Sequence, residues 1–111
     1  MEYINRIELA GKIGIVKLSS VGDTRIASFS LATCYCYRNR QGEPIEEVTW
    51  HNVSAWEGPQ CKDLDKLSKG DNVRVIGRIR TSRITASDGS ERILSEVVAA
   101  KIERISADQQ S

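Results

Sequence analysis

Residues 46–71 read EEVTWHNVSAWEGPQCKDLDKLSKGD, and this stretch decides the fold of the chain. Residues 46–56 alternate between the two faces of an extended chain, which predicts a β-strand, and Glu57-Gly58-Pro59 ends the pattern. Residues 60–68 are the only helical candidate, because apolar side chains recur there at three-residue spacing, at Cys61, Leu64 and Leu67. Gly70 is placed to cap that helix. The stretch therefore predicts a strand, a short helix and the start of another strand.

Alternating segments lie on both sides of this stretch. A first strand starts at Ile7, with apolar residues at Ile7, Leu9, Ile13 and Ile15, and Gly11 interrupts the series, which predicts a bend. A second strand is expected over about residues 25–37 and ends at a hairpin turn, residues 39–42. The last two strands are expected over about residues 72–84 and 92–104, joined by a turn at Asp88-Gly89.

The order is therefore three strands, a short helix and two strands. This order is typical of the oligonucleotide-binding (OB) fold, an all-β barrel of five strands with one short helix between strands 3 and 4. A first strand bent at a glycine suits this barrel, because such a strand can pair in both of its halves. We expect one OB-fold domain over residues 1–105, followed by a short polar tail, residues 106–111.

Composition limits the possible functions. The 111 residues carry a net charge of +1, so any nucleic-acid partner requires positive charge concentrated on one face. The charge by itself argues against a nucleic-acid binder. No apolar run approaches the ~20 residues of a membrane span, and the N-terminus lacks the features of a signal peptide. We therefore expect a cytoplasmic protein with no membrane partner.

The residues for catalysis or for metal binding are sparse. Three cysteines, Cys34, Cys36 and Cys61, have no framework spacing and are interpreted as small residues of a reduced protein. His51 is the only histidine, so a zinc site lacks ligands. Cys34 or Cys36 as a nucleophile has no histidine in its own strand and no acid to orient one. We expect no metal, no cofactor and no enzymatic activity.

The third predicted strand carries the most informative face. Its even-numbered residues put Trp50 and Trp56 on one side, with Asn52 and Ser54 between them. Wide aromatic surfaces separated by short polar groups are typical of a stacking platform, which binds single strands without reading their sequence. The alternative is that one or both tryptophans fill the core.

The fourth predicted strand supports the platform. Val73, Val75 and Ile79 are expected on the core side, and Gly77 is expected to mark a bulge or a close approach. The other side carries a row of arginines interrupted by Ile76, namely Arg74, Arg78 and Arg80. Arginines beside aromatics can bind phosphates and stack on bases, although such a row is also typical of an ordinary solvated face.

Two hairpins add further cations. Arg38 and Arg40 flank the first hairpin turn beside Tyr37, and Arg83 lies near the last one. A long basic hairpin can fold over a bound strand. Three nearby acidic residues dilute this positive charge: Glu43, Glu46 and Glu47.

Several segments together resemble the bacterial single-stranded DNA-binding protein family. They are NRIELAGKIG (residues 5–14), ASFSLAT (27–33), TWHNV (49–53), LSKGDNV (67–73) and GRIRT (77–81), the last leading to Asp88-Gly89. The resemblance covers about residues 4–105, and the combination of segments in this order is specific.

The resemblance implies a barrel that assembles as a dimer of dimers and binds single-stranded DNA over its aromatic side chains, in replication, recombination or repair. Trp50, Trp56 and Tyr37 fall at aromatic positions of the family. Lys69 and Arg80 fall at basic positions that contact the DNA backbone. His51 falls at a subunit-interface position.

The sequence also departs from the family. Ile84 stands where the family often has a stacking tryptophan, Asn52 replaces a frequent arginine, and the loop between the first two strands is shorter. Arg74 stands where a tyrosine often faces the other dimer, which leaves a dimer and a tetramer both open. The sequence ends at Ser111 without the family's long tail and acidic tip, so we expect a tail-less form and no protein partners recruited through such a tail.

Two alternatives remain at this point. Primosomal replication protein N is a related dimeric barrel that also lacks an acidic tail. A structural or protein-interaction barrel that binds no nucleic acid is the third class. Quenching of tryptophan fluorescence by a single strand separates the first two from the third, and the oligomeric state helps to separate the first two from each other.

Overall fold

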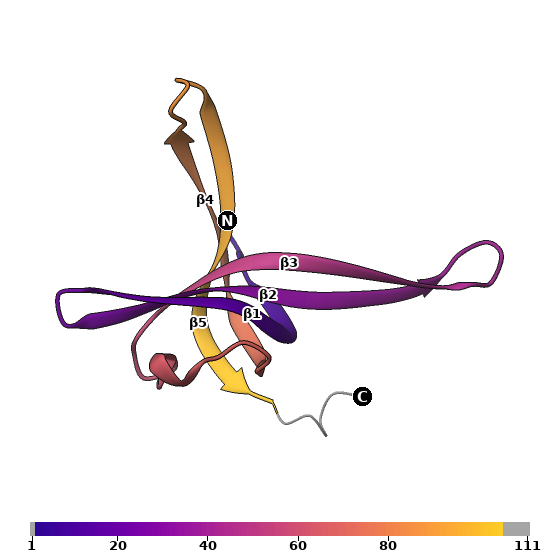
Figure 1. Cartoon of the computed structure of the whole chain (residues 1–111), viewed down its shortest axis with the longest axis horizontal. Helices are drawn as coiled ribbons and strands as arrows, with labels where there is room; N and C mark the ends of the chain where they lie inside the picture. Colours follow the sequence, from indigo (N-terminus) through magenta and orange to yellow (C-terminus); the bar gives the residue numbers. More distant parts are fainter. Residues whose placement is uncertain (1, 106–111) are drawn as a thin grey trace.

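The computed structural model describes residues 2–105, so the predicted tail, residues 106–111, lies outside the described residues. The elements run in the order β1 (Ile7–Val21), β2 (Thr24–Arg38), β3 (Pro44–Trp56), η1 (Leu64–Lys66), β4 (Asn72–Thr85) and β5 (Glu91–Arg104). The five strands close into a barrel in the spatial order β1-β2-β3-β5-β4. β3 and β5 pair in parallel, and the other neighbours are antiparallel. The predicted all-β, five-stranded barrel is confirmed (Figure 1).

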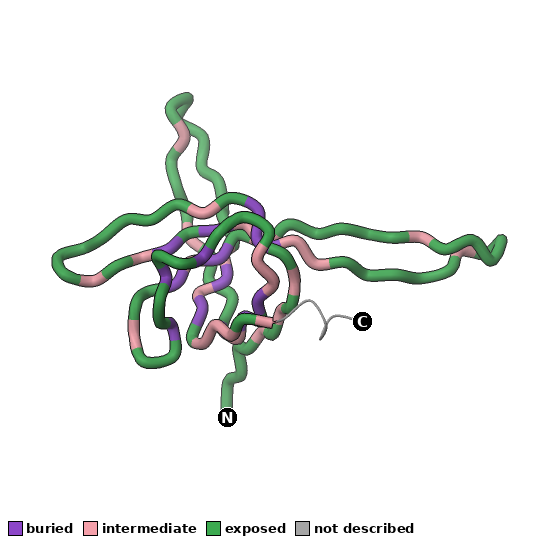
Figure 2. Tube along the Cα trace, turned by 60° about the horizontal axis from the view of Figure 1, so that its bottom comes forward, coloured by how far each residue is buried: buried purple, intermediate pink, exposed green. Residues whose placement is uncertain are grey.

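The core lies inside the barrel and consists of aliphatic and small side chains with one aromatic, Phe29. Within residues 2–105, no charged or polar residue is fully buried. Figure 2 shows the buried segments gathered at the centre, with exposed chain around them. The buried apolar residues are Ile13, Ala27, Phe29, Leu31, Val53, Ala55, Cys61, Leu64, Leu67, Val73, Val75, Val97 and Ala99.

β1 pairs with both of its neighbours, as the bend at a glycine predicts. Its first half pairs with β4 and its second half with β2, and the two registers meet at Lys12. A Cβ on Gly11 would lie 2.0 Å from the carbonyl oxygen of Ala32. Only a glycine therefore lets β1 approach β2 at this point.

A bulge in β1 changes which side chains face the core. Ile13 pairs with Leu31 and Val16 with Phe29, so two residues of β1 stand opposite one residue of β2. The extra residue reverses the alternation, and Val16 packs against the core while Ile15 is 66% exposed. The apolar alternation that runs through Ile13 to Ile15 in the sequence therefore does not continue into the core.

The pairing of β4 with β5 contains a second irregularity. The register shifts between Ile76 and Gly77, and a Cβ on Gly77 would lie 2.1 Å from the carbonyl oxygen of Val98. This confirms the predicted role of Gly77. Val73 and Val75 are buried as predicted, but Ile79 is 45% exposed, because beyond Gly77 β4 pairs with β5 alone among the described residues.

The predicted helix over residues 60–68 is shorter in the structure. It is the single 3-10 turn η1, which follows Asp63 in a left-handed conformation. The three-residue spacing of the apolar side chains fits a 3-10 helix, in which residues i and i+3 lie above one another. Cys61, Leu64 and Leu67 are all buried, so the predicted apolar stripe is correct although the helix length is wrong. Gly70, with φ 94°, belongs to the turn before β4 instead of capping the helix.

Three two-stranded ribbons project from the barrel (Figures 1 and 2). The β1–β2 arm, the β2–β3 arm and the β4–β5 arm end at turns that contain Gly22, Gly42 and Gly89, all with positive φ. The arms are almost entirely exposed, because a two-stranded ribbon has no second layer to cover it.

Candidate nucleic-acid interface

Both tryptophans lie on the outer surface of β3. Trp50 is 61% exposed and Trp56 is 49% exposed, whereas Val53 and Ala55, on the other side of the strand, are buried. The core alternative for the tryptophans is therefore wrong. Six residues of extended chain separate the two Cα atoms by about 20 Å, so the tryptophans form two separate aromatic surfaces.

Small side chains of β2 lie beside the tryptophan strand. Ala32 is paired with Trp50, Ser30 with Asn52, and Ser28 with Ser54. Because these residues are short, the surface between the tryptophans is hollowed. A groove runs there, and Ile15 and Lys17 of β1 contribute to its lining. We call this surface the outer trough; it comprises Trp50, Asn52, Ser54 and Trp56 of β3 with Ser28, Ser30 and Ala32 of β2.

Gly14 fixes the position of Trp50. A Cβ on Gly14 would lie 2.7 Å from Cζ3 of Trp50 and 2.6 Å from Oγ of Ser30. The six-membered part of the indole therefore lies directly against the backbone of β1. The Ser30 hydroxyl is held in turn by the backbone N–H of Ile15, which donates to it at 2.9 Å. The alternation pattern gave no sign of this contact, because it joins residues from different strands at a bulge.

One predicted arginine lies on the same outer surface as the trough. β5 lies between β3 and β4, and Val98 pairs with Ser54 on one side and with Arg78 on the other. Paired residues project to the same face, so Arg78 stands two strands, or about 10 Å, from the tryptophan strand. It makes no ion pair with any residue that the structure describes.

Arg80 is also on the outer face, but it has an acidic partner. Its Nε lies 3.7 Å from Oε1 of Glu96, its neighbour across the β4–β5 ladder. Glu96 also lines the groove along the trough. This carboxylate reduces the positive field of Arg80 at the edge of the trough, a feature that the arginine row in the sequence did not reveal.

The predicted residues of the β2–β3 arm are not brought together with the tryptophans. Tyr37 pairs with Ile45, an odd-numbered position, and so lies on the opposite face of the ribbon from Trp50. Its ring centroid is 6.0 Å from that of Tyr35. Arg38 donates to the carbonyl of Gly42 at 2.8 Å, and Arg40 is exposed in the turn.

Two other predicted cations lie in separate places. Arg83 is exposed on the β4–β5 arm, where it pairs with Ile93. Lys69 is exposed in the turn before β4, which is tied to β1 by the N–H of Gly70 donating to the carbonyl of Ile13 at 2.8 Å. The roles of these cations in binding stay predictions.

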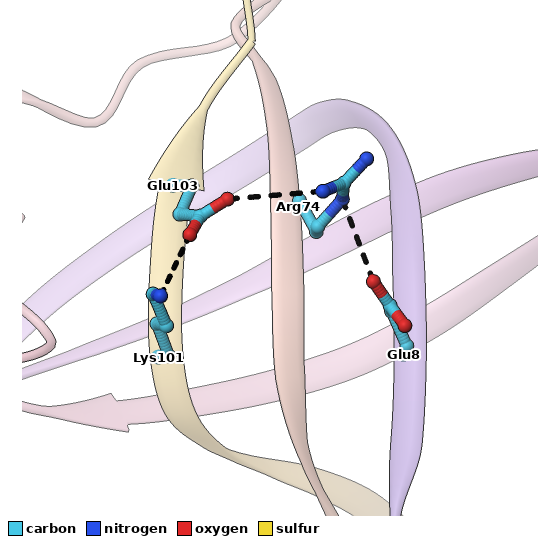
Figure 3. Close-up of polar contacts among 4 residues, drawn as sticks. All are labelled: Glu8, Arg74, Lys101 and Glu103. Carbon is cyan, nitrogen blue, oxygen red and sulfur yellow. Dashed lines mark ion pairs between the residues drawn. The ribbon is translucent and has the colours of Figure 1, made fainter.

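The two predicted interface residues have partners within the chain. His51 is half-buried, with Nε2 2.9 Å from Oγ1 of Thr33. Arg74 lies 3.6 Å from Glu8 of β1 and 3.9 Å from Glu103 of β5, and Lys101 lies 2.8 Å from Glu103 (Figure 3). The hydrogen bond from Lys101, with the charges of Lys101 and Arg74, holds the pKa of Glu103 below its usual value.

β1 has an open edge beside this ion-pair row. Its pairing with β2 begins only at Lys12, so residues 7–11 are paired on one side, with β4, among the described residues. β2 is likewise paired only with β3 beyond Thr33. The groove between the two strands is lined by Ala10, Gly11, Lys12, Ala32 and Cys34, together with the outer face of β4 and the end of β5.

The described residues give little support to three other possibilities, namely a reactive cysteine, a metal site of three or more ligands and a membrane span. Cys34 and Cys36 lie within 3.7 Å of each other, and their hydrogen bond raises the pKa of Cys34, with further contributions from its surroundings and from Glu46. A raised pKa makes a thiol a weaker nucleophile at neutral pH. Within residues 2–105, no group of three or more His, Cys, Asp or Glu residues is arranged to hold a metal ion. No helix in that part of the chain is long and apolar enough to cross a membrane.

Comparison with known proteins places this geometry in context. The model of the single-strand binding protein family matches residues 4–105. The single-stranded DNA-binding protein of Neisseria meningitidis serogroup A is 28% identical over 105 residues, covering 92% of this chain and 60% of that protein. The corresponding protein of Xylella fastidiosa is 30% identical over 105 residues, covering 92% of this chain and 63% of that protein. The chain thus spans about three fifths of the length of these relatives.

Solved structures show the same fold. The structure described as Plasmodium falciparum SSB in complex with ssDNA has a TM-score of 0.85 at 24% identity, covering 96% of this chain and 98% of that chain. A deletion mutant of the single-stranded DNA-binding protein from Thermus aquaticus has a TM-score of 0.78 at 22% identity, covering 94% of this chain and 51% of that chain. These likenesses support the barrel fold described above.

Proposed function

The chain belongs to the single-strand binding protein family, and from this premise we propose that it binds single-stranded DNA without sequence preference, by base stacking and phosphate contacts. The observation that carries the proposal is the outer trough, where two exposed tryptophans flank a hollow of small side chains. Every base has a π-face, so such a surface accepts any sequence. The chain acts as a cytoplasmic, non-catalytic protein that protects single strands in replication, recombination or repair.

The charges around the trough support phosphate binding. Lys17 of β1 lines it on one side, and Arg78 lies on the same outer surface on the other. Phosphate contacts release counterions from DNA and make affinity fall as salt rises. With a net charge of only +1, local placement of cations supplies the attraction, so we expect little binding to duplex DNA.

A titration with poly-dT at two salt concentrations, followed by tryptophan fluorescence, tests the proposal. We expect quenching, tight binding at low salt and weaker binding at high salt, with weaker binding to RNA. Equal affinity for duplex and single strand would contradict the proposal. If the titration showed neither quenching nor binding, the alternative of a barrel that binds no nucleic acid would be favoured. The similarity to single-stranded DNA-binding proteins disfavours the primosomal replication protein N alternative.

We also propose that the chain forms a homo-oligomer, a dimer or a dimer of dimers. The open edge of β1 supports this, because an unpaired strand edge is a ready template for a second copy. The resemblance to the family adds support, because it implies interface positions for His51 and Arg74. Light scattering at micromolar concentration is expected to give at least twice the mass of one chain, and a monomer would contradict the proposal.

Gly14→Ala is expected to weaken binding through Trp50. The new methyl group meets the Ser30 hydroxyl and the indole ring, which are both side-chain groups, so we expect both to be displaced while the backbone stays in place. Binding of poly-dT should fall by about 1 kcal/mol, the lower end of the range for one stacked base. In a Trp56→Phe background, the emission maximum of Trp50 should shift as well.

Gly58→Ala is the matched control for this substitution. A Cβ on Gly58 has no neighbour closer than 4.0 Å, and its φ is not positive. It should therefore leave both the emission and the affinity unchanged. If Gly14→Ala shifted neither of them, the positioning of Trp50 by Gly14 would be wrong.

Glu96→Gln is expected to strengthen DNA binding. The substitution removes a negative charge from the groove and frees Arg80 for a phosphate. The slope of log affinity against log salt should steepen by up to about one, the value for one additional phosphate contact. Arg80→Ala should do the reverse, weakening binding to all sequences alike.

Glu103→Gln controls for net charge alone. It changes the charge by the same amount, but it belongs to the ion-pair row around Arg74 and does not line the trough. A Glu96→Gln protein that bound no more tightly than the Glu103→Gln protein would show that Arg80 and Glu96 do not act at the DNA.

A further inference from the structure

Two exposed thiols lie side by side on the β2–β3 arm. Cys34 and Cys36 are two residues apart in β2, so the alternation of the strand puts both on one face. Their sulfur atoms are 3.7 Å apart, and both residues are exposed to solvent. This arm is the ribbon of β2 and β3 that projects to the right in Figure 1. Cys34 follows Ala32 on the same face of β2, so the pair begins where the outer trough ends.

The strand geometry disfavours a direct disulfide between them. Alternate residues of a strand have Cα atoms about 6.6–6.8 Å apart, at the upper limit of what a disulfide spans. Their Cβ atoms point the same way, so they are separated by a similar distance, whereas a disulfide requires about 3.5–4.5 Å. Closing an S–S bond therefore requires the backbone to move. One atom bound between the two sulfurs requires only small rotations of the side chains.

We propose that Cys34 and Cys36 form a two-thiolate site for a soft, monovalent metal cation of the copper(I) class. Thiolates select soft ions. Structural zinc needs four ligands, and within residues 2–105 these thiols belong to no cluster of three or more ligating side chains. A cation that can be bound by two sulfur ligands alone matches the pair. This assignment departs from the sequence-based expectation of cysteines that are only small residues and of a chain without a metal.

The cross-strand neighbour Glu46 favours a cation at the pair. Glu46 stands opposite Cys36 across the β2–β3 ladder, and Val48 stands opposite Cys34. The Glu46 carboxylate attracts a positive ion, and the apolar Val48 side chain reduces access of water on one side. Arg38, the next basic residue along the same face of β2, is directed to the carbonyl of Gly42, and Lys12 and Arg74 line the groove on the Cys34 side.

The binding step is balanced without any change of oxidation state. Each thiol loses its proton to solvent, two S–Cu bonds form, and the site changes from neutral to a net charge of −1. No electron is transferred, so no oxidant or reductant takes part. Because the protein delivers two ligands on one rigid strand, the second bond forms within the molecule and adds to the affinity of the first.

Competition with a chromophoric copper(I) chelator tests this proposal. The reduced full-length chain is titrated without oxygen into the copper(I) complex of bicinchoninate, and the loss of the chelator colour gives the copper withdrawn. We expect one copper(I) per chain. Cys34→Ser and Cys36→Ser should each weaken the binding by about 100-fold, since each leaves a single thiol and loses the intramolecular second bond.

Cys61 supplies the internal control. It is buried beneath the barrel and lies far from the arm along the chain, and the Cys34→Ser/Cys36→Ser double variant retains it. Both substituted positions are exposed, so circular dichroism and the thermal melt should match the unsubstituted chain. Copper withdrawn equally by the double variant, or not withdrawn by the unsubstituted chain, would overturn the assignment. DNA is absent from this assay, so its outcome is independent of the proposed DNA binding.

Discussion

Replacing Trp50 and Trp56 together by alanine is expected to weaken single-stranded DNA binding by about 2–6 kcal/mol, with little change in the thermal melt. Each stacked base contributes about 1–3 kcal/mol, and two tryptophans whose Cα atoms lie about 20 Å apart should contribute nearly independently. Both side chains are about half exposed, so their removal opens no cavity in the core. A poly-dT titration and a thermal melt of each single variant and the double variant give the two quantities.

Two further variants test the stacking interpretation. Trp50→Phe keeps an aromatic face and should recover most of the affinity lost by Trp50→Ala. Tyr3→Ala removes an exposed aromatic that precedes β1 and is not one of the trough residues, and it should leave binding unchanged. Alanine variants that melt far lower but bind normally once folded would contradict the stacking role of the tryptophans.

Leu64→Ala is expected to destabilise the fold by about 2–5 kcal/mol, the range for a large aliphatic residue truncated in a core. Leu64 is 0% exposed and is the buried residue of η1, the only helical turn among the described residues. It belongs to the barrel core together with Cys61 and Leu67 on the same connection. Urea unfolding followed by circular dichroism measures the loss.

Lys66→Ala is the matched control, because Lys66 is on the same turn but exposed. It should change stability by no more than about 0.5 kcal/mol. If Leu64→Ala were as mild as Lys66→Ala, the 3-10 turn would be a surface connection and would not close the barrel core.

Local patterns predicted most of the fold. The alternation in residues 46–56 and the turn residues at Gly42 and Gly89 depend on neighbours in the chain, and the strands and turns lie where these patterns put them. The spacing of Cys61, Leu64 and Leu67 predicted a buried stripe but not the length of the helix. A spacing of three fits one turn of 3-10 helix as well as a longer α-helix.

The errors arose where one strand depends on another. Ile15 and Val16 exchange places because β1 has an extra residue opposite Ser30, and only the pairing with β2 reveals this. Ile79 continues the inward alternation of β4 but stands where the barrel ends, so no side chain covers it fully.

The site was predicted in part for the same reason. The shared face of Trp50 and Trp56 follows from alternation within one strand, and their exposure agrees with it. The contact of Trp50 with Gly14, the row from Ser54 to Arg78, and the neutralisation of Arg80 by Glu96 each join different strands. Such contacts depend on the register between strands, which alternation in a single sequence does not encode.

The bulge at Gly14 and Ile15 has a consequence for how the chain can change in length. In β1, odd-numbered residues face inward before the bulge, and Val16 is the first even-numbered residue to do so after it. Deleting one of the two bulged residues would restore a regular ladder. It would also shift the register of the β1–β2 arm by one residue or move its side chains to the opposite face. Insertions and deletions should therefore be accepted at the tip near Gly22, where nothing packs, and rejected at Gly14 and Ile15. The bulge thus fixes which residues of β1 face the core. The three arms are the places where evolution or protein engineering can add or remove residues.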